Sequence, residues 1–319
     1  MALPLSEIEA ARSRLDAYLR PTPLAFCDAL SRRCDRAVAL KLESLQPTGA
    51  FKVRPALNGL LTHLDQARSA GVIASSSGNF AQAVAWAARE LAVDAQIVMM
   101  SDASAFKRDR TRALGATVVE CEPTFEARWE TTFRIERESG RLLVHPYDST
   151  ETIAGDGVIG LELIEQYDAD FTIAVPISGG GLISGIASAV KAVRPGCRVV
   201  GVQPAANPSM ERSLAAGSRT TTQPGGSVAD ALAVATPGER TFEIVRELVD
   251  DVVLVSEEEL IEAVRFLANE GKVVVEAGGA AGVAALLAGK LPASPATCVC
   301  VVSGGNVAPA QLAQWLAQD

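Results

Sequence analysis

Short apolar runs alternate with longer amphipathic segments along most of the chain. The strand-like runs lie at residues 37–42, 72–74, 95–99, 117–119, 142–144, 172–175, 199–202, 252–255 and 299–302. Helical patterns separate these runs and begin near Asn79, Ala105 and Phe125 in the first half of the chain. Strands that alternate with helices favour parallel pairing, because the chain must cross over between neighbouring strands. The pattern therefore predicts an α/β fold with parallel sheets flanked by helices.

Two capping boxes mark helix starts within this pattern. Ser6 and Glu9 precede an opening amphipathic helix, and Ser256 and Glu259 open a helix over residues 257–269. In both cases we expect the serine hydroxyl to accept a hydrogen bond from the backbone three residues further on.

Residues 171–190 form a run without a charged side chain that is long enough to cross a membrane as a helix. The run contains Pro176 and three consecutive glycines flanked by serines, which interrupt a helix. We therefore expect a strand, a loop and a helix here, and no association with a membrane.

The composition is that of a soluble globular protein, with 48% hydrophobic and 21% charged residues among 319. This length accommodates two domains, and the net charge of -9 argues against a nucleic-acid partner. The six cysteines show no CxxC spacing, and Glu7 and Glu9 interrupt any signal peptide, so a cytoplasmic location fits best. Because the chain has two histidines, we expect neither a zinc site nor a Ser-His-Asp triad.

Residues 46–58 join turn chemistry directly to a helix that opens on Lys52. Pro47 and Gly49 end the preceding strand, and apolar residues recur at helical spacing from Val53. The helix dipole opposes a cation in this first turn. Two interpretations stay open: a solvated lysine that tolerates a small penalty, or a lysine whose neutral amine forms a Schiff base.

Three further motifs follow in the chain, each at the end of a strand-like run. They are Ser76-Ser77-Gly78-Asn79, Ser178-Gly179-Gly180-Gly181-Leu182 and Ser303-Gly304-Gly305-Asn306. Together with the stretch Thr48-Gly49-Ala50-Phe51-Lys52, they resemble the motifs of the fold-type-II pyridoxal-phosphate enzymes, a group that includes the serine and threonine dehydratases and serine racemase. The chain departs from the group at Ala50, where serine is usual, and at Pro55, where glycine is common.

The resemblance implies the two-domain, tryptophan synthase β-like fold of this group. Residues 71–145 would form a small domain nested within a large cofactor-binding domain made of residues 1–70 and 146–319. The cofactor, pyridoxal 5'-phosphate, would lie in the cleft between them. The resemblance also leads us to expect a homodimer.

The resemblance further assigns the cofactor contacts. Lys52 would hold the cofactor beside Phe51, Asn79 would contact its ring hydroxyl, and Ser303 would contact its ring nitrogen. Its phosphate would be bound by Ser178, Gly179, Gly180, Gly181 and Leu182. Without the resemblance, the glycines also fit a tight turn, the second motif fits a helix cap, and residue 303 fits a serine that ends a strand.

The reaction implied is the loss of water from a 3-hydroxy amino acid, followed by hydrolysis of the resulting enamine to a 2-oxo acid and ammonium. Lys52 would take the Cα proton, Ser76 and Asn79 would lie against the substrate, with Ser76 binding its carboxylate, and Ser77 would transfer a proton opposite Lys52. A neutral hydroxyl at Ser303 would not keep the ring nitrogen protonated, which favours loss of a β-substituent over transamination. The length leaves no room for an appended regulatory domain, so we expect a degradative role.

The substrate pocket is expected to be apolar on one side. Phe80 stands where the group usually has histidine, and Tyr147 would also face the substrate. Such a wall would leave a second carboxylate unpaired, which disfavours 3-hydroxyaspartate, whereas a ring on the β-carbon would gain aromatic contact. We therefore expect 3-phenylserine as substrate, followed by threonine and serine. Three alternatives stay open: a racemase of the serine racemase type, a hydroxyaspartate dehydratase, and a binding protein without catalysis.

Some members of the group also bind a divalent cation just after the strand at residues 199–202. Gln203 and Ser209 occupy the positions where carboxylates are expected, so two anionic oxygen ligands are missing. We predict no divalent metal at this position.

Overall fold

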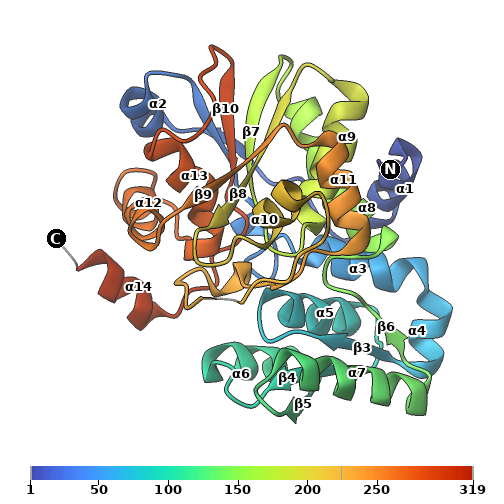
Figure 1. Cartoon of the computed structure of the whole chain (residues 1–319). Coiled ribbons are helices and arrows are strands. Elements are labelled where there is room, and N and C mark those ends of the chain that lie inside the picture. The colour runs from blue at the N-terminus through green and yellow to red at the C-terminus, as the bar shows by residue number, and fades with distance from the viewer. Residues whose placement is uncertain (1, 224, 318–319) are drawn as a thin grey trace.

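The computed structural model describes residues 2–223 and 225–317, and two β-sheets organise it (Figure 1). The six-stranded sheet has the order β1 (Leu24–Phe26), β2 (Val38–Lys41), β10 (Thr297–Val301), β7 (Phe171–Pro176), β8 (Arg198–Pro204) and β9 (Asp251–Val255). The four-stranded sheet has the order β5 (Thr117–Cys121), β4 (Ala95–Met100), β3 (Val72–Ser75) and β6 (Leu142–Leu143). Every strand-like run of the sequence forms one of these strands, which confirms the α/β class.

The strands pair in parallel with the exception of β1, which runs antiparallel to β2 at the edge of the larger sheet. Leu24 pairs with Lys41, and Phe26 pairs with Ala39. β1 was not predicted from the sequence, because three residues are too short to show an alternation of apolar and polar positions. The short connection from β1 through a helix to β2 brings the second strand back beside the first.

Helices cover both sheets, and they begin close to the predicted positions. They are α1 (Leu5–Leu15), α2 (Asp28–Cys34), α3 (Val53–Thr62), α4 (Leu64–Ala70), α5 (Asn79–Glu90), α6 (Ala105–Ala113), α7 (Phe125–Ser139), α8 (Thr150–Gln166), α9 (Gly181–Val193), α10 (Ser209–Ala216), α11 (Glu239–Leu248), α12 (Glu257–Asn269), α13 (Ala281–Leu287) and α14 (Pro309–Leu316). The short 3-10 helices among the described residues are η1 (Glu43–Leu45), η2 (Asp230–Leu232) and η3 (Ala277–Ala280).

One of the two predicted capping boxes is confirmed. At the start of α12, the backbone N–H of Glu259 donates to the Ser256 hydroxyl at 3.3 Å, and the N–H of Ser256 donates to the Glu259 carboxylate at 2.7 Å. The box predicted at Ser6 is wrong, because α1 begins at Leu5 after Pro4, so that Ser6 already lies inside the helix.

The uncharged run at residues 171–190 forms a strand, a loop and a helix, as predicted. β7 ends at Pro176, and α9 starts at Gly181. Across residues 2–223 and 225–317, no helix combines the length and the apolar character that a membrane crossing requires.

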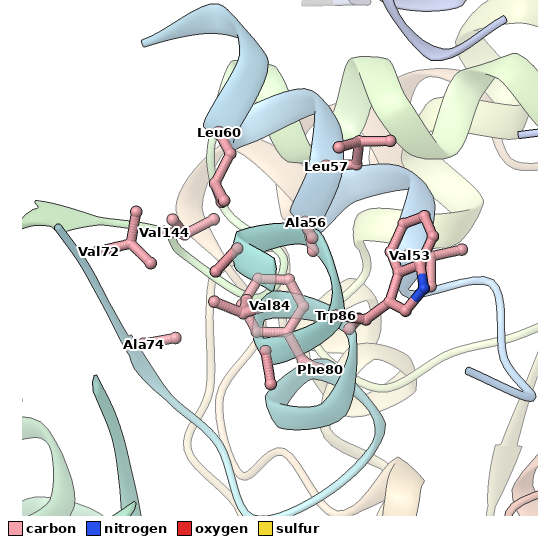
Figure 2. Close-up of a cluster of buried hydrophobic side chains, with 14 of the residues drawn as sticks. Val53, Ala56, Leu57, Leu60, Val72, Ala74, Phe80, Val84, Trp86 and Val144 are labelled. Carbon is pink, nitrogen blue, oxygen red and sulfur yellow. The ribbon is translucent and has the colours of Figure 1, made fainter. Parts of the chain in front are cut away.

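A hydrophobic core joins α3 to α5 (Figure 2). Ala56 and Leu60 of α3 are buried with Phe80 and Val84 of α5. All strands of the smaller sheet lie within residues 71–145, the segment predicted to form the small domain. Because α3 precedes this segment and α5 belongs to it, the two parts of the chain share one core. The predicted domain limits themselves stay a prediction.

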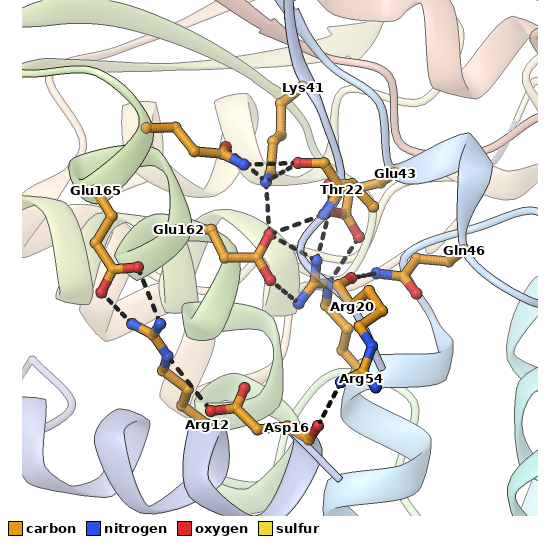
Figure 3. A network of polar contacts seen from close by, with 11 residues as sticks. Arg12, Asp16, Arg20, Thr22, Lys41, Glu43, Gln46, Arg54, Glu162 and Glu165 are labelled. Atoms are coloured by element: carbon orange, nitrogen blue, oxygen red, sulfur yellow. Dashed lines mark hydrogen bonds and ion pairs between the residues drawn. The ribbon is translucent and has the colours of Figure 1, made fainter. Parts of the chain in front are cut away.

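A buried polar network fixes the start of α3 (Figure 3). The Arg54 guanidinium donates to the Glu43 carboxylate at 2.8 Å and to the Glu162 carboxylate at 2.6 Å. Lys41 Nζ donates to the same Glu162 carboxylate at 2.5 Å. All four side chains are 5% exposed or less. The network links β2, η1, α3 and α8, and it anchors the helix turn that directly follows Lys52.

Candidate active site

A cavity of about 460 Å³ lies where the loops after β3, β7 and β10 meet. It is lined by every residue that the sequence analysis assigned to cofactor or substrate: Phe51, Lys52, Ser76, Ser77, Asn79, Phe80, Tyr147, Ser178, Gly179, Gly180, Gly181, Leu182 and Ser303. β7 and β10 are neighbours in the larger sheet, so the loops after their carboxyl ends lie at one edge of that sheet, and the loop after β3 comes from the smaller sheet. The separate roles of these residues stay predictions.

Lys52 directly precedes α3 and is partly buried in the cavity wall. Its Nζ donates to the carbonyl oxygen of Pro146 at 2.7 Å and lies 4.8 Å and 5.5 Å from the ring centres of Phe51 and Phe80. Burial lowers the pKa of the Lys52 amine, and the carboxyl of Asp156 opposes this effect. This partial burial favours the interpretation of a neutral amine over that of a solvated lysine, and the role of Lys52 stays a prediction. A lowered pKa increases the share of neutral, nucleophilic amine.

The glycine loop at residues 178–181 connects β7 to the first turn of α9. Gly180 has a φ of +99°, which other residues rarely adopt, and a Cβ there would lie 2.8 Å from the Cβ of Thr241. The Thr241 hydroxyl donates to the carbonyl oxygen of Gly179 at 2.6 Å and so holds the loop. The first N–H groups of a helix lack partners within the helix, and the helix dipole favours negative charge at this end. The loop is therefore suited to bind an anion such as a phosphate ester.

The second motif connects β3 to α5 without capping the helix through a side chain. The Ser77 hydroxyl accepts a hydrogen bond from the N–H of Met100 at 3.3 Å. The Asn79 side chain accepts from Asn306 at 3.0 Å and donates to the Glu276 carboxylate at 2.5 Å. The helix-cap interpretation of these residues is therefore wrong, and their side chains border the cavity instead.

Ser303 follows β10 and borders the cavity with only 7% of its surface exposed. Its carbonyl oxygen accepts a hydrogen bond from the N–H of Phe51 at 3.0 Å. The next residue, Gly304, forms an isolated β-bridge with Ala50. These backbone contacts fix the last strand against the segment that carries Lys52, although the two are about 250 positions apart in the sequence.

Aromatic rings form much of one cavity wall. Phe125 and Trp129 extend from α7, and Trp129 stacks on His145 with 5.1 Å between ring centres. The His145 ring in turn contacts Tyr147 at 4.7 Å. Burial lowers the pKa of His145 to about 4 and raises the pKa of Tyr147 to about 12, so both rings are neutral at neutral pH. Phe80 borders the cavity too, but it is 2% exposed and packs mainly into the core.

Arg128 is a cavity residue that the sequence analysis missed. Its guanidinium lies 5.2 Å from the ring centre of Phe125, and burial lowers its pKa. Its Nε is buried and has no hydrogen-bond partner among the described residues. No local sequence motif marks this arginine. Its place in the cavity wall and its lack of a partner at Nε are properties of the folded chain.

Glu276 and the ion pair between Lys107 and Asp230 were also missed. Burial raises the pKa of Glu276 to about 7, while Lys107 and the hydrogen bond from Asn79 lower it. Lys107 lies on α6 beside the smaller sheet, and Asp230 lies on η2 in the other part of the chain. Lys107 and Asp230 are far apart in the sequence, so no local sequence pattern predicts that they pair.

Gln203, expected to mark the absence of a metal, is fully buried at the end of β8. Its side-chain oxygen accepts hydrogen bonds from the N–H groups of Met210 and Glu211, both at 3.0 Å, at the start of α10. Its amide nitrogen lies 3.5 Å from the Ser209 hydroxyl. Within residues 2–223 and 225–317, no three His, Cys, Asp or Glu side chains gather in a way that could hold a metal ion. The metal-free site stays a prediction.

The cavity fits pyridoxal 5'-phosphate on structural grounds. A glycine loop at a helix start suits the phosphate, and the close approach of Thr241 leaves no room for a side chain at Gly180. Lys52 offers an amine to the aldehyde carbon. Asn79 and Ser303 line the cavity and would offer polar groups to the ring, and aromatic residues would supply apolar contact.

Comparisons with known proteins agree with this arrangement. Residues 15–304 match the family described as "Pyridoxal-phosphate dependent enzyme". The chain is 41% identical over 303 residues to L-threonine ammonia-lyase of Thermotoga maritima, which covers 95% of this chain and 75% of that protein. It is 40% identical over 313 residues to L-threonine dehydratase catabolic TdcB of Escherichia coli (strain K12), which covers 97% of this chain and 95% of that protein.

The fold is similar to that of maize serine racemase, with a TM-score of 0.94 and 36% sequence identity. This match covers 98% of this chain and 97% of the maize chain. The family match extends over most of the chain and includes three of the four motifs in full, together with Ser303 and Gly304 of the fourth. The chain therefore belongs to the family of pyridoxal-phosphate dependent enzymes.

Proposed function

We propose that the protein is a pyridoxal-phosphate dependent ammonia-lyase, or dehydratase, that converts a 3-hydroxy amino acid into a 2-oxo acid and ammonium. The observation that carries this proposal is Lys52, a partly buried amine of lowered pKa in one cavity with an anion-binding glycine loop. Two relatives that match nearly the whole chain bear the names L-threonine ammonia-lyase and L-threonine dehydratase.

In this proposal, the residues of the chain hold the reacting groups and move protons. Lys52 anchors the cofactor and later takes the Cα proton of the substrate as a free amine. The bound cofactor supplies an electron sink for the pair left on Cα. Ser76 binds the substrate carboxylate, and the Ser77 hydroxyl gives a proton to the departing hydroxyl group. Ser303 offers a neutral hydroxyl to the ring nitrogen, which favours elimination over transamination.

The aromatic wall supports a substrate with a ring on its β-carbon. Phe125, Trp129 and Tyr147 border the cavity, and an aromatic contact contributes about 0.5 to 1.5 kcal/mol beyond burial. We propose 3-phenylserine as the preferred substrate, with threonine and serine next. Phe80 contributes less to this wall than the sequence suggested, because it is 2% exposed.

Arg128 supports a second candidate substrate, 3-hydroxyaspartate. From the sequence, this compound was disfavoured because its second carboxylate had no partner. Arg128, however, borders the cavity and forms no ion pair with a described residue. A charge-assisted bond from arginine to that carboxylate would offset its desolvation. kcat/KM measured for all four compounds separates the candidates, and Arg128→Met should reduce the value for 3-hydroxyaspartate alone. A tenfold lead for 3-hydroxyaspartate, about 1.4 kcal/mol, would contradict the aromatic-substrate proposal.

Racemisation is the alternative that the likeness to maize serine racemase supports. Lys52 and Ser77 would then act as proton carriers on opposite faces of Cα. The two reactions differ in product, because a racemase releases the other enantiomer and no ammonium. Parallel assays for 2-oxo acid and for the enantiomer, with the same protein sample, decide between them.

Lys52 itself supplies the test of the proposed function. Borohydride reduction should attach the cofactor covalently to Lys52, as peptide mass spectrometry would show, and Lys52→Ala should reduce 2-oxo acid formation below detection. Continued turnover by Lys52→Ala would contradict the proposal. A protein that is labelled at Lys52 but releases neither ammonium nor enantiomer would be a binding protein instead.

A further inference from the structure

Asp156 on α8 is a buried acid that the proposed reaction does not use. Its side chain is 0% exposed, and neither carboxylate oxygen has a hydrogen-bond partner among the described residues. An unpartnered buried carboxylate is costly in its charged form, and burial raises the pKa of Asp156 to about 8. The acid can therefore change its charge within the pH range in which enzymes work.

Two features of the cavity lie next to this acid. One carboxylate oxygen of Asp156 would be 3.1 Å from a Cβ placed on Gly181, the first residue of α9. The positive charge of Lys52 lowers the pKa of Asp156, and the carboxylate in turn opposes the lowering of the Lys52 pKa. Asp156 is thus close both to the helix start that would bind a phosphate and to the amine that would hold the cofactor.

Close packing of α8 holds the acid in this position. A Cβ on Gly155 would lie 2.8 Å from the Cα of Pro55 in α3. A Cβ on Gly185 in α9 would lie 2.5 Å from the backbone nitrogen of Gly157. Glycines at these crossings let three helices approach closely, so the Asp156 side chain has little freedom to move away from the loop.

The other charged groups near Asp156 are held in fixed states. Glu43 raises the pKa of Asp156, and Arg54 lowers it. These two side chains pair with each other inside the buried network. His145 and Tyr147 lie in the loop before α8. The pKa of His145 is about 4 and that of Tyr147 is about 12, both far from the pKa of Asp156.

Two further acids border the same region. Asp148 accepts hydrogen bonds from the N–H groups of Glu239 and Arg240 at the start of α11. Glu276 lines the cavity with a pKa of about 7, so it also titrates near neutral pH and requires a control.

We propose that Asp156 is a positioning residue that takes up a proton from the solvent when an anion occupies the glycine loop. This inference rests on the proposed function only in assuming that the loop binds the cofactor phosphate. The start of α9 stabilises negative charge, but two neighbouring anions repel each other strongly in a buried site. A neutral Asp156 carboxyl removes that repulsion, and an ionised one partly balances the Lys52 ammonium when no anion is bound.

The proposal has a defined pH signature. The pKa of Asp156 is raised above its ordinary value, so the carboxyl is neutral below about pH 8 and ionised above it. Anion binding should therefore require little proton uptake at lower pH and up to one proton above this value. The affinity for the anion should fall as pH rises through this range, by at most about tenfold per pH unit.

Sulfate is the probe, because it neither titrates in this range nor reacts with Lys52. Calorimetry of the full chain, freed of cofactor, in buffers of different ionisation enthalpy measures the protons taken up as sulfate binds. Sulfate that pyridoxal 5'-phosphate displaces is taken to be the sulfate bound at the glycine loop. We expect proton uptake in the unmodified protein at about pH 8 to 9, and none in Asp156→Asn, whose sulfate affinity should not change with pH there.

Glu276→Gln is the matched control, because it removes a different buried carboxyl from the same cavity and should leave the uptake above pH 8 in place. If Asp156→Asn does not fold, the unmodified protein still tests the proposal, because absence of proton uptake on sulfate binding overturns it. Equal uptake in Asp156→Asn and the unmodified protein also overturns it. Uptake that depends on Asp156, in a protein that forms no 2-oxo acid, would support this inference while contradicting the proposed function.

Discussion

The chemistry of Lys52 follows from its surroundings in the fold. Removal from water disfavours the ammonium form and lowers the pKa of the amine, while the nearby Asp156 carboxyl opposes the shift. Burial is the larger effect. The helix dipole at the start of α3 acts in the same direction as burial, because it disfavours a cation at that end.

Ser77→Ala should reduce kcat by about 10²- to 10⁴-fold, because proton transfer by a positioned hydroxyl contributes this much. Cofactor content should stay unchanged, since Ser77 is not among the residues proposed to hold the cofactor. Steady-state kinetics with 2-oxo acid detection checks the effect. Ser76→Ala is the control, and it should raise KM more than it lowers kcat. Equal effects of the two substitutions on kcat would contradict the separate roles of these serines.

At the scale of secondary-structure elements, α3 depends on the ion network beneath it. Arg54→Met should lower the free energy of unfolding by about 3 to 5 kcal/mol, because Glu43 would lose its buried cationic partner and Glu162 would keep only Lys41. Denaturant unfolding measures the change. The matched control is Arg12→Met, because Arg12 pairs with Glu165 at the surface and should cost about 0 to 1 kcal/mol. Similar losses in both variants would argue against a structural role for the network.

The two serines at predicted helix starts allow a direct comparison. Ser256→Ala should lower the free energy of unfolding by about 1 kcal/mol, because it removes the cap of α12. Ser6→Ala should have an effect near zero, since Ser6 lies within α1 and caps nothing. Thermal unfolding of both variants tests the pair. A larger loss at Ser6 than at Ser256 would show that α1 begins as the sequence predicted.

At the scale of the whole molecule, the pair of Lys107 and Asp230 joins α6 to η2 across the cavity. Lys107→Met should raise KM severalfold, because the two parts of the chain would enclose the substrate less firmly. Unfolding should change by less than about 1 kcal/mol, since the Asp230 side chain is 64% exposed and the pair is screened by water.

The same substitution has a pH consequence. Lys107 lowers the pKa of Glu276, which is about 7, so its removal should move that titration to higher pH. The pH profile of kcat/KM measures the shift, and Lys107→Arg, which keeps the charge, should leave the profile in place. A profile that does not move in Lys107→Met would show that Glu276 does not control the reaction.

Much of the fold could be predicted from local patterns. The interior strands of both sheets are continuous apolar runs such as Val199 to Val202, and strands of this kind are recognised without knowledge of their partners. The edge strand β1 could not be recognised, because its three residues show no period and its pairing is decided by β2. The cap at Ser6 was predicted wrongly because Pro4 starts the helix earlier.

The candidate site, like the fold, has features that the sequence predicts and features that only the tertiary structure shows. The sequence by itself determined which residues are candidates for the site, Lys52 and the three glycine-containing motifs, because each motif is a short run of neighbouring residues that can be recognised without the fold. Only the tertiary structure decided which of them share a cavity and how that cavity is charged. The pKa values of Lys52 and Asp156 arise from burial and from charges supplied by distant segments, and burial also leaves the Nε of Arg128 without a hydrogen-bond partner among the described residues. Such effects depend on three-dimensional distance and exclusion of water, which no stretch of sequence contains.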